Sequence, residues 1–176
     1  MSVLEHSEID YMLTGAFASS MQGEPRSTHD IDFVVLIETS DIGPLIRSFP
    51  APDFYIAEVA IREAIETGGV FDLIDTVTGD KADFWMLTQD PFDQSRSARK
   101  QTVQVFGISL TVSTAEDTIL QKLRSVIATG GNEKAFHDAL RVYEVQTERL
   151  DRDYLEHWVD RLSLRDLWDR LLARAR

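Results

Sequence analysis

The sequence predicts an α+β protein in which helices flank a mixed β-sheet and a further helical region follows the sheet. Two patterns support this expectation. Short apolar runs separated by Gly and Pro fill residues 1–112, as expected for strands joined by turns and short helices. After Ser113 the apolar residues recur at helical intervals instead. We therefore expect a core at residues 1–112 and a C-terminal helical region at 113–176 that packs on it.

The N-terminal part of the core is predicted to form a strand, a helix and a second strand. Residues 11–14 are an apolar run that ends at Gly15, which indicates a strand and a turn. Residues 16–22 suit a helix, which Gly23-Glu24-Pro25 would end because Gly and Pro disfavour helical continuation. The second strand is expected to begin at Asp30 and to end near Ile37.

The remainder of the core is predicted to contain two helices and two hairpins. Ser40 and Asp41 would cap a helix through residue 48, and residues 54–66 show apolar positions at helical intervals. Residues 71–77 and 82–87 are predicted to be strands of one hairpin, joined by the polar turn 78–81. Residues 101–105 and 109–112 would form a second hairpin that turns at Phe106 and Gly107.

The C-terminal region is predicted to be helical throughout. Thr114 and Asp117 have the spacing of a capping box, and an apolar face follows them. Gly130-Gly131 would end this helix, and Asn132 would cap the next one. Two more helices are expected, at residues 154–162 and 164–172. Their Trp158 and Trp168 alternate with leucines at helical spacing, which favours a place in the hydrophobic core over a base-stacking platform.

Asp30 and Asp32 form the most informative motif in the chain. If residues 30–35 are a strand, both carboxylates point to one face, about 7 Å apart, while Ile31 and Phe33 point to the other. Two such carboxylates favour a cation between them. Oxygen ligands of this kind suit Mg²⁺, which commonly binds one or two carboxylates together with substrate phosphates.

The order of residues around this motif resembles that of a known family. A strand is followed by the Gly15 turn, a short helix, and then Gly23, Arg26, Thr28, Asp30 and Asp32. This order resembles the signature of the polymerase-beta-like nucleotidyltransferases, and most of all the AbiEii-type and related minimal members. Several of those are toxin or antitoxin components of bacterial defence. The resemblance implies a nucleotidyltransferase-type sheet, Mg²⁺ or Mn²⁺ as cofactor, and a nucleoside triphosphate such as ATP as substrate.

Catalysis of this type needs a third carboxylate near the attacking hydroxyl. Asp83 is the candidate, because Lys81-Ala82-Asp83-Phe84 resembles the Lys-x-Asp-aromatic strand that supplies this residue in the family. Asp72 and Asp75 lie on the preceding predicted strand. Their odd spacing puts them on opposite faces, so only one of them could assist. The alternative for Asp83 is a solvent-facing residue just after a hairpin turn.

Two segments before the Asp-x-Asp motif are predicted to bind the nucleotide. Backbone N–H groups of Gly15 and Ala16, at a turn leading into a helix, would form an anion site for phosphates. The family usually has Gly or Ser at the second position, so Ala16 is a departure that removes a hydroxyl. Arg26 would contact a phosphate or the aspartates, or form a structural ion pair, and Thr28 would bond to the Asp30 amide.

The helical region offers two further candidates. In AbiEii-type proteins, a lysine on the first helix after the core and an aspartate on the next helix face the active cleft. Lys122 and Asp138 occupy similar places, so the resemblance implies that they bind the nucleotide. The alternative interpretation is that both are ordinary exposed charges on helices.

Composition limits the classes of function. The chain has no cysteine, which excludes disulfides and a thiol nucleophile, and no apolar stretch of transmembrane length. No secretory start is visible, so we expect a cytoplasmic protein without a membrane partner. The net charge is −12, and residues 1–114 hold 18 of the 30 acidic but only 7 of the 18 basic residues. Non-specific nucleic-acid binding is therefore disfavoured. A C-terminal series of arginines would be the exception, guiding a tRNA end or a partner protein: Arg161, Arg165, Arg170, Arg174 and Arg176.

Three hypotheses follow. The first is an enzyme that transfers a nucleoside monophosphate from NTP to a hydroxyl on a protein, an RNA or a small molecule, with Asp30, Asp32 and Asp83 as metal ligands and catalytic residues. The second, motivated by Ala16 and the acidic surface, is a catalytically degenerate binding module that acts as an antitoxin or as the partner of a cognate toxin. The third is an acidic α/β domain whose Asp-x-Asp motif has no function. Its strand order would then separate Asp83 from Asp32.

Overall fold

The computed structural model describes residues 2–28, 30–105 and 107–175. Contacts divide the chain into two compact units. The first comprises Met1–Thr14 and Thr28–Val112, and the second comprises Gly15–Ser27 and Ser113–Arg176. The second unit therefore includes the segment between the first two strands, a segment that sequence analysis groups with the core.

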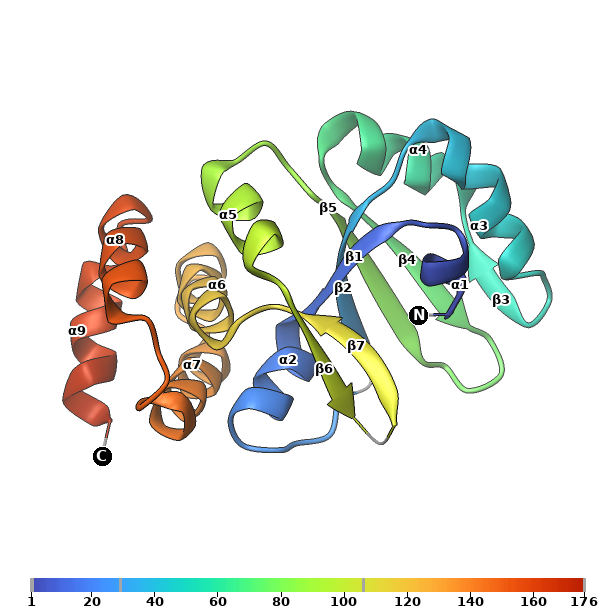
Figure 1. The fold of residues 1–176 in the computed structure, drawn as a ribbon. Coiled ribbons are helices and arrows are strands. Elements are labelled where there is room, and N and C mark those ends of the chain that lie inside the picture. The colour runs from blue at the N-terminus through green and yellow to red at the C-terminus, as the bar shows by residue number, and fades with distance from the viewer. Residues whose placement is uncertain (1, 29, 106, 176) are drawn as a thin grey trace. The chain divides into compact units, whose positions relative to one another are not determined.

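The first unit is built on a 7-stranded sheet with the order β3-β4-β5-β2-β1-β7-β6 (Figure 1). Its strands are β1 (Asp10–Thr14), β2 (Asp30–Leu36), β3 (Phe54–Ile56), β4 (Val70–Asp75), β5 (Lys81–Met86), β6 (Gln101–Val105) and β7 (Ile108–Val112). The pairs β2–β5 and β1–β7 are parallel and the other neighbours are antiparallel. The sheet is thus mixed, as the sequence predicts.

An aromatic layer fixes the register of the central strands. Phe33 of β2 and Phe71 of β4 both pair with Phe84 of β5. Their rings stack at 5.2 and 5.0 Å between centroids, and all three side chains are buried. Because side chains alternate along a strand, a buried aromatic at these positions turns their neighbours to the opposite face of the sheet.

The helices of the first unit are α1 (Ser2–His6), α3 (Ile42–Ser48), α4 (Glu58–Thr67) and α5 (Pro91–Arg99). Helices α1, α3 and α4 form one group beside the sheet (Figure 1). The buried apolar residues are Ile42 and Leu45 on α3 and Ile61 and Ala64 on α4. Helix α4 ends at Gly68, whose φ of 68° is the left-handed conformation that glycine adopts without strain.

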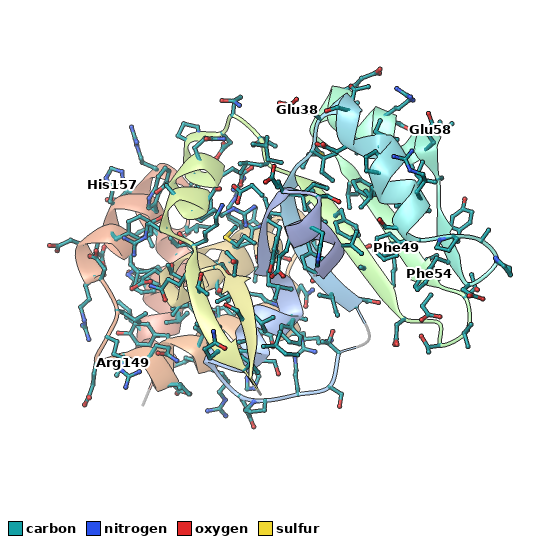
Figure 2. All side chains as sticks on the ribbon, turned by 45° about the vertical axis from the view of Figure 1, so that its right-hand side comes forward. Glu38, Phe49, Phe54, Glu58, Arg149 and His157 are labelled. Carbon is teal, nitrogen blue, oxygen red and sulfur yellow. The ribbon has the colours of Figure 1, made fainter. Side chains whose placement is uncertain are left out.

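Two elements of this unit differ from the sequence-based expectation. The helix expected at 54–66 begins only at Glu58, because Phe54–Ile56 pairs with β4 as an edge strand. The Phe54 ring packs edge-to-face on Phe49, 5.3 Å between centroids, which holds the strand in place (Figure 2). Helix α5 was not expected, although Asp90 caps it by accepting bonds from the Phe92 and Asp93 amides. A 3-10 helix, Thr39–Asp41, precedes α3. Its N-cap is Glu38, which forms a capping box with Asp41, so Ser40 is not the cap that the sequence predicts.

The second unit is helical: α2 (Gly15–Gln22), α6 (Ala115–Ala128), α7 (Glu133–Gln146), α8 (Arg152–Arg161) and α9 (Arg165–Arg174). Thr114 and Asn132 cap α6 and α7 as predicted, and Asp151 caps α8. Trp158 and Trp168 are buried, which confirms their assignment to the hydrophobic core. Within the described part of the chain, every helix is too short or too polar to cross a lipid bilayer.

Helix α2 joins this unit through specific contacts. It packs against α6 and α7. The Gln22 side-chain amide donates to the Ser113 carbonyl at 2.6 Å, and the Gln146 amide donates to the Gln22 carbonyl at 2.8 Å. These two bonds join the end of α2 to the residues just before α6 and to the last residue of α7.

Candidate active site

Asp30 and Asp32 lie on β2 with the alternation that the sequence predicts. Asp32 pairs with Thr14 of β1, while the buried Phe33 belongs to the aromatic layer. Asp30 is exposed, and Asp32 is half-buried. Thr28 precedes them, and its hydroxyl donates to the Asp30 carbonyl oxygen at 3.0 Å. The expected bond to the Asp30 amide is therefore replaced by one to the carbonyl, because a threonine hydroxyl can donate as well as accept.

The third carboxylate, Asp83, lies directly beside Asp32. Strands β2 and β5 are neighbours, and Asp83 is the register partner of Asp32. Asp83 also pairs with Asp72 of β4. Register partners share a face of a sheet, so Asp32, Asp83 and Asp72 form a row across three strands, here called the carboxylate row. This strand order contradicts the third hypothesis, which required Asp83 to lie far from Asp32.

The packing of the opposite face explains why the row forms. Phe33, Phe84 and Phe71 each follow or precede a row member by one residue, and all are buried in the aromatic layer. Of the two aspartates on β4, Asp72 therefore shares the face of Asp83. Asp75 instead organises the following turn, where its carboxylate accepts from the Val77 and Thr78 amides at 2.8 and 3.0 Å.

Lys81 supplies the positive charge within the row. Its ammonium lies 2.7 Å from Asp83 Oδ1 and 3.5 Å from Asp72 Oδ2. Burial raises the pKa of the Asp83 carboxyl, and Asp72 raises it further, while Lys81 opposes the change. The hydrogen bond to Asp83 in turn raises the pKa of Lys81. Lys81 is not among the site residues that the sequence predicts, although a separation of two residues on one strand places it on the face of Asp83.

The carboxylates suit a hard cation by their chemistry and by their shared face. Oxygen donors of this kind are the ligands that Mg²⁺ prefers. Among the residues that the structure describes, however, no group of three or more His, Asp or Glu side chains is already gathered as a metal site. The cation that the row holds is the Lys81 ammonium.

The predicted phosphate turn lies where β1 ends. Gly15 has a φ of 64° and begins α2, so the backbone requires glycine there. The hydroxyls of Ser19 and Ser20, which follow Ala16 on α2, are hydrogen-bonded to backbone groups. Ser19 is buried and donates to the Ala16 carbonyl at 3.1 Å, and Ser20 bonds to the carbonyl and amide of Arg26.

Arg26, Lys122 and Asp138 meet within the helical unit. The Arg26 guanidinium donates to both Asp138 oxygens at 3.3 and 3.0 Å, and Lys122 Nζ lies 2.7 Å from Asp138 Oδ2. Asp138 is 8% exposed, so it is not the ordinary surface charge of the alternative interpretation. Burial alone would raise the pKa of Asp138, but the two cations outweigh it and lower the pKa below its usual value. We call these three residues the ion triad.

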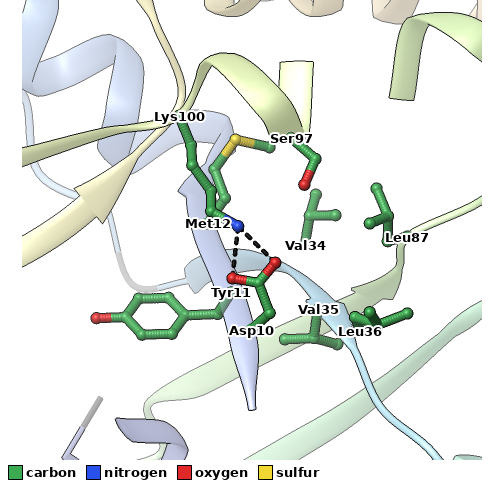
Figure 3. Close-up of a pocket in the computed structure, with 9 residues that line it drawn as sticks. All are labelled: Asp10, Tyr11, Met12, Val34, Val35, Leu36, Leu87, Ser97 and Lys100. Atoms are coloured by element: carbon green, nitrogen blue, oxygen red, sulfur yellow. Dashed lines mark hydrogen bonds and ion pairs between the residues drawn. The ribbon is translucent and has the colours of Figure 1, made fainter. Parts of the chain in front are cut away.

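Two other features lie outside the candidate residues. A small pocket in the first unit has the ion pair between Lys100 and Asp10 in its lining (Figure 3). It is lined by Asp10, Tyr11, Met12, Val34, Val35, Leu36, Leu87, Ser97 and Lys100, none of which is among the predicted site residues.

The arginines of the last helix are paired with acidic side chains. On α9, Arg170 and Arg174 pair with Glu133. Arg165 pairs with Glu156 and Asp160, and Arg176 lies outside the described residues.

The fold defined by this mixed sheet and its helices is that of the nucleotidyltransferases. An antigenic nucleotidyltransferase-like protein from Paracoccidioides brasiliensis is 17% identical, with a TM-score of 0.55 over 99% of this chain and 89% of that chain. The antibiotic-resistance factor ANT(2'')-Ia is 12% identical, with a TM-score of 0.54 over 98% of this chain and 90% of its own. Its complex with adenylyl-2''-tobramycin gives a TM-score of 0.57 at 12% identity, over 95% and 93% of the two chains. Neither a protein-family model nor a curated protein matches the sequence.

Proposed function

We propose that the chain is a metal-dependent nucleotidyltransferase that transfers a nucleoside monophosphate from NTP to a hydroxyl acceptor. The observation that carries the proposal is the register of β2 and β5, which puts Asp83 next to Asp32 on one face of a nucleotidyltransferase-type sheet. Asp30, two residues from Asp32, belongs to the same face.

Each carboxylate has a role in this proposal. Asp30, Asp32 and Asp83 would hold Mg²⁺ or Mn²⁺, which would stabilise the charge that develops on the attacking and leaving oxygens. In the reaction, the acceptor oxygen bonds to the α-phosphorus as the bond to pyrophosphate breaks. Asp83 accepts the acceptor proton, and its raised pKa suits it to this task near neutral pH better than an unperturbed carboxylate.

The remaining candidates would bind the triphosphate. Gly15 and Ala16 offer backbone N–H groups, and Thr28 shapes the start of β2 through its bond to Asp30. Arg26 and Lys122 supply positive charge. Asp138 holds both cations in place through the ion triad, so its part in nucleotide binding is to position them.

Transfer of label from nucleotide to acceptor tests the proposal. Purified protein is incubated with α-³²P-labelled NTPs, Mg²⁺ and cell lysate, and labelled products are separated. We expect labelling by the wild type and none by Asp32→Asn or by Asp30→Asn/Asp32→Asn. Asp53→Asn, at an exposed position before β3, is the matched control and should label normally. Full labelling by the Asp30→Asn/Asp32→Asn variant would refute the assignment.

Three features of the same residues favour a second function. The ammonium of Lys81 already neutralises Asp83, and no three acidic or histidine side chains of the described residues are gathered for a metal. These features, with Ala16 in the phosphate turn, support a catalytically degenerate module that binds a partner protein. Isothermal titration with NTP and Mg²⁺ separates the two proposals, because absence of heat at millimolar ligand favours the binding module.

The biological setting is part of the same proposal. The resemblance to AbiEii-type proteins supports a cytoplasmic role in toxin–antitoxin or defence systems, with a cognate toxin or antitoxin as partner. The complex of ANT(2'')-Ia with adenylyl-2''-tobramycin supports a small-molecule hydroxyl as the acceptor; hydroxyls of a protein or a tRNA are the alternative acceptors. Labelling in fractionated lysate, before and after protease or ribonuclease treatment, distinguishes these acceptor classes.

A further inference from the structure

Trp85 differs from the other two tryptophans in its exposure. Its side chain is 46% exposed, whereas Trp158 and Trp168 are 7% and 2% exposed. An indole ring is a large apolar group that contributes most when it is covered. An indole presented to solvent from the strand that also carries Asp83 therefore indicates a surface that a ligand covers.

The position of Trp85 links it to the carboxylate row. It lies two residues after Asp83 on β5, so its side chain shares the face of Asp83. Its register partners are Val34 of β2 and Val70 of β4. Val70 is 39% exposed, so it forms with Trp85 an apolar strip directly beside the carboxylate row.

A hydrogen bond orients the ring. The Trp85 Nε1–H donates to Asp32 Oδ1 at 3.4 Å, towards the long end of hydrogen-bond distances. The edge of the indole is thereby turned to the carboxylate that the proposed function assigns to the metal, beside which the reacting phosphate would lie. The ring lies within reach of the groups attached to that phosphate.

Charge determines which part of a nucleotide fits the strip. The three carboxylates of the row outnumber the single Lys81 ammonium, so the row repels phosphates unless a further cation is bound, whereas a nucleobase is uncharged and flat. We propose that Trp85 stacks on the nucleobase of the bound NTP, an inference that rests on the proposed function. Stacking on an exposed aromatic side chain is tolerant of base identity and strengthens nucleotide binding by about ten-fold or more.

Fluorine NMR observes this contact directly. The protein labelled with 5-fluorotryptophan gives one resonance for each of its 3 tryptophans, and Trp85→Phe identifies the resonance of Trp85. A non-hydrolysable ATP analogue with Mg²⁺ should shift the Trp85 resonance and leave the two buried ones in place. Tripolyphosphate with Mg²⁺, which lacks a base, should shift it much less.

Binding constants of matched variants provide the second measurement. Trp85→Leu removes the ring and should weaken binding of the ATP analogue about ten-fold or more, without changing binding of tripolyphosphate. Trp85→Phe keeps a ring and should bind within about two-fold of the wild type. Tyr55→Leu, which removes an exposed aromatic ring on β3, is the control and should bind like the wild type.

The outcomes separate this inference from the function on which it rests. If titration shows that the analogue binds while the Trp85 resonance responds equally to tripolyphosphate, the stacking proposal is wrong and the nucleotidyltransferase proposal stands. If the wild type binds neither ligand, both are wrong. A Trp85 resonance that shifts with protein concentration alone would show that a second copy covers the strip, which also overturns the proposal.

Discussion

The protonation of Asp83 depends on two side chains that act in opposite directions. Burial raises its pKa, Lys81 lowers it, and Asp72 raises it again. Asp72 and Lys81 are also near each other, since the Lys81 ammonium lies 3.5 Å from Asp72 Oδ2. Asp72, Asp83 and Lys81 thus place two carboxylates and one ammonium side by side on neighbouring strands, so removal of any one of them changes the electrostatic environment of the other two.

Two substitutions should therefore move the pKa of Asp83 in opposite directions. Lys81→Gln removes the cation that favours the ionised carboxylate, so the pKa should rise further. Asp72→Asn removes a competing negative charge, so the pKa should fall towards its usual value. Carboxyl ¹³C chemical shifts of labelled aspartate, followed with pH, measure both. Movement of the pKa in the same direction in both variants would contradict the role assigned to Lys81.

The proposed reaction gives this pKa a kinetic consequence. A general base must be deprotonated, so activity should fall on the acidic side as the pH passes below the pKa of Asp83. The acidic limb should lie at higher pH in Lys81→Gln and at lower pH in Asp72→Asn than in the wild type. If the dependence of activity on pH is identical in all three proteins, Asp83 is not the general base.

Asp138 is the residue on which the ion triad depends. Asp138→Asn leaves Lys122, 14% exposed, and Arg26, 28% exposed, without their counter-charge. Removal of one partner from a buried ion pair is strongly destabilising, so we expect a loss of about 3 kcal/mol in the free energy of unfolding at neutral pH. Urea denaturation measures it. Asp160→Asn, which removes an exposed partner of Arg165, is the control and should cost less than about 1 kcal/mol.

The same contribution should depend on pH with a definite sign. The pKa of Asp138 lies below its unfolded value of 3.8, so the folded protein binds its proton less readily than the unfolded chain. The stabilisation is therefore complete above that value and is lost as the pH falls through the lower folded pKa. The difference in stability between wild type and Asp138→Asn should shrink in acid. A difference that is constant from pH 7 to strong acid would show that the carboxylate charge is not its origin.

Helix α2 and helix α7 approach each other at a glycine. A Cβ atom on Gly23 would lie 2.9 Å from the Val142 amide nitrogen, 3.0 Å from the Arg141 carbonyl carbon and 3.1 Å from the Ser19 carbonyl oxygen. These are backbone atoms, which cannot move aside as a flexible side chain can. The glycine therefore sets how closely the end of α2 packs on α7, in addition to ending the helix as the sequence predicts.

Gly23→Ala should consequently destabilise the helical unit. We expect a loss of about 1–3 kcal/mol in the free energy of unfolding, as for other insertions of a methyl group into a packed contact. Gly43→Ala in α3 is the matched control, since its Cβ would meet only the flexible end of Arg47 at 3.2 Å. That change should be neutral or stabilising by up to about 1 kcal/mol, because Ala favours helix. Equal stabilities of the two variants, measured by urea denaturation, would contradict the close approach.

The sequence predicts elements well where one residue pattern decides them. Alternation around Asp30 and Asp32 fixes β2, and the caps at Thr114 and Asn132 fix the starts of α6 and α7. Sequence-based prediction fails where pairing with a segment distant in the chain determines the secondary structure. Residues 54–56 have helical periodicity but become a strand because β4 offers an edge to pair with. The same limit applies to Asp72 and Trp85, whose place beside Asp83 and Asp32 depends on register between strands.

In the described part of the last helix, Arg165, Arg170 and Arg174 are paired with acidic side chains, where the sequence shows only a series of arginines. Arg165 lies within 2.7 Å of Glu156 and is also bonded to Asp160, while Arg170 donates to both oxygens of Glu133 at 2.7 and 2.8 Å. Arg170 also covers the Phe136 ring at 4.1 Å. Because of Arg170, the pKa of Glu133 is lowered, so the glutamate stays ionised beside it. These arginines are neutralised locally, in a protein whose net charge is −12.

The charge balance predicts that the protein does not bind RNA through its last helices. Fluorescence anisotropy with labelled tRNA should show no tight binding at about 150 mM salt, where phosphate contacts by lysine and arginine are already weakened. The variant Glu133→Gln/Glu156→Gln/Asp160→Asn removes the acidic partners of Arg170 and Arg174 and the two nearest partners of Arg165, so it should bind tRNA measurably in low salt and release it as salt is added. Tight binding of tRNA by the wild type at about 150 mM salt would contradict the neutralisation, because a surface whose arginines already hold carboxylates gains little by exchanging them for phosphates.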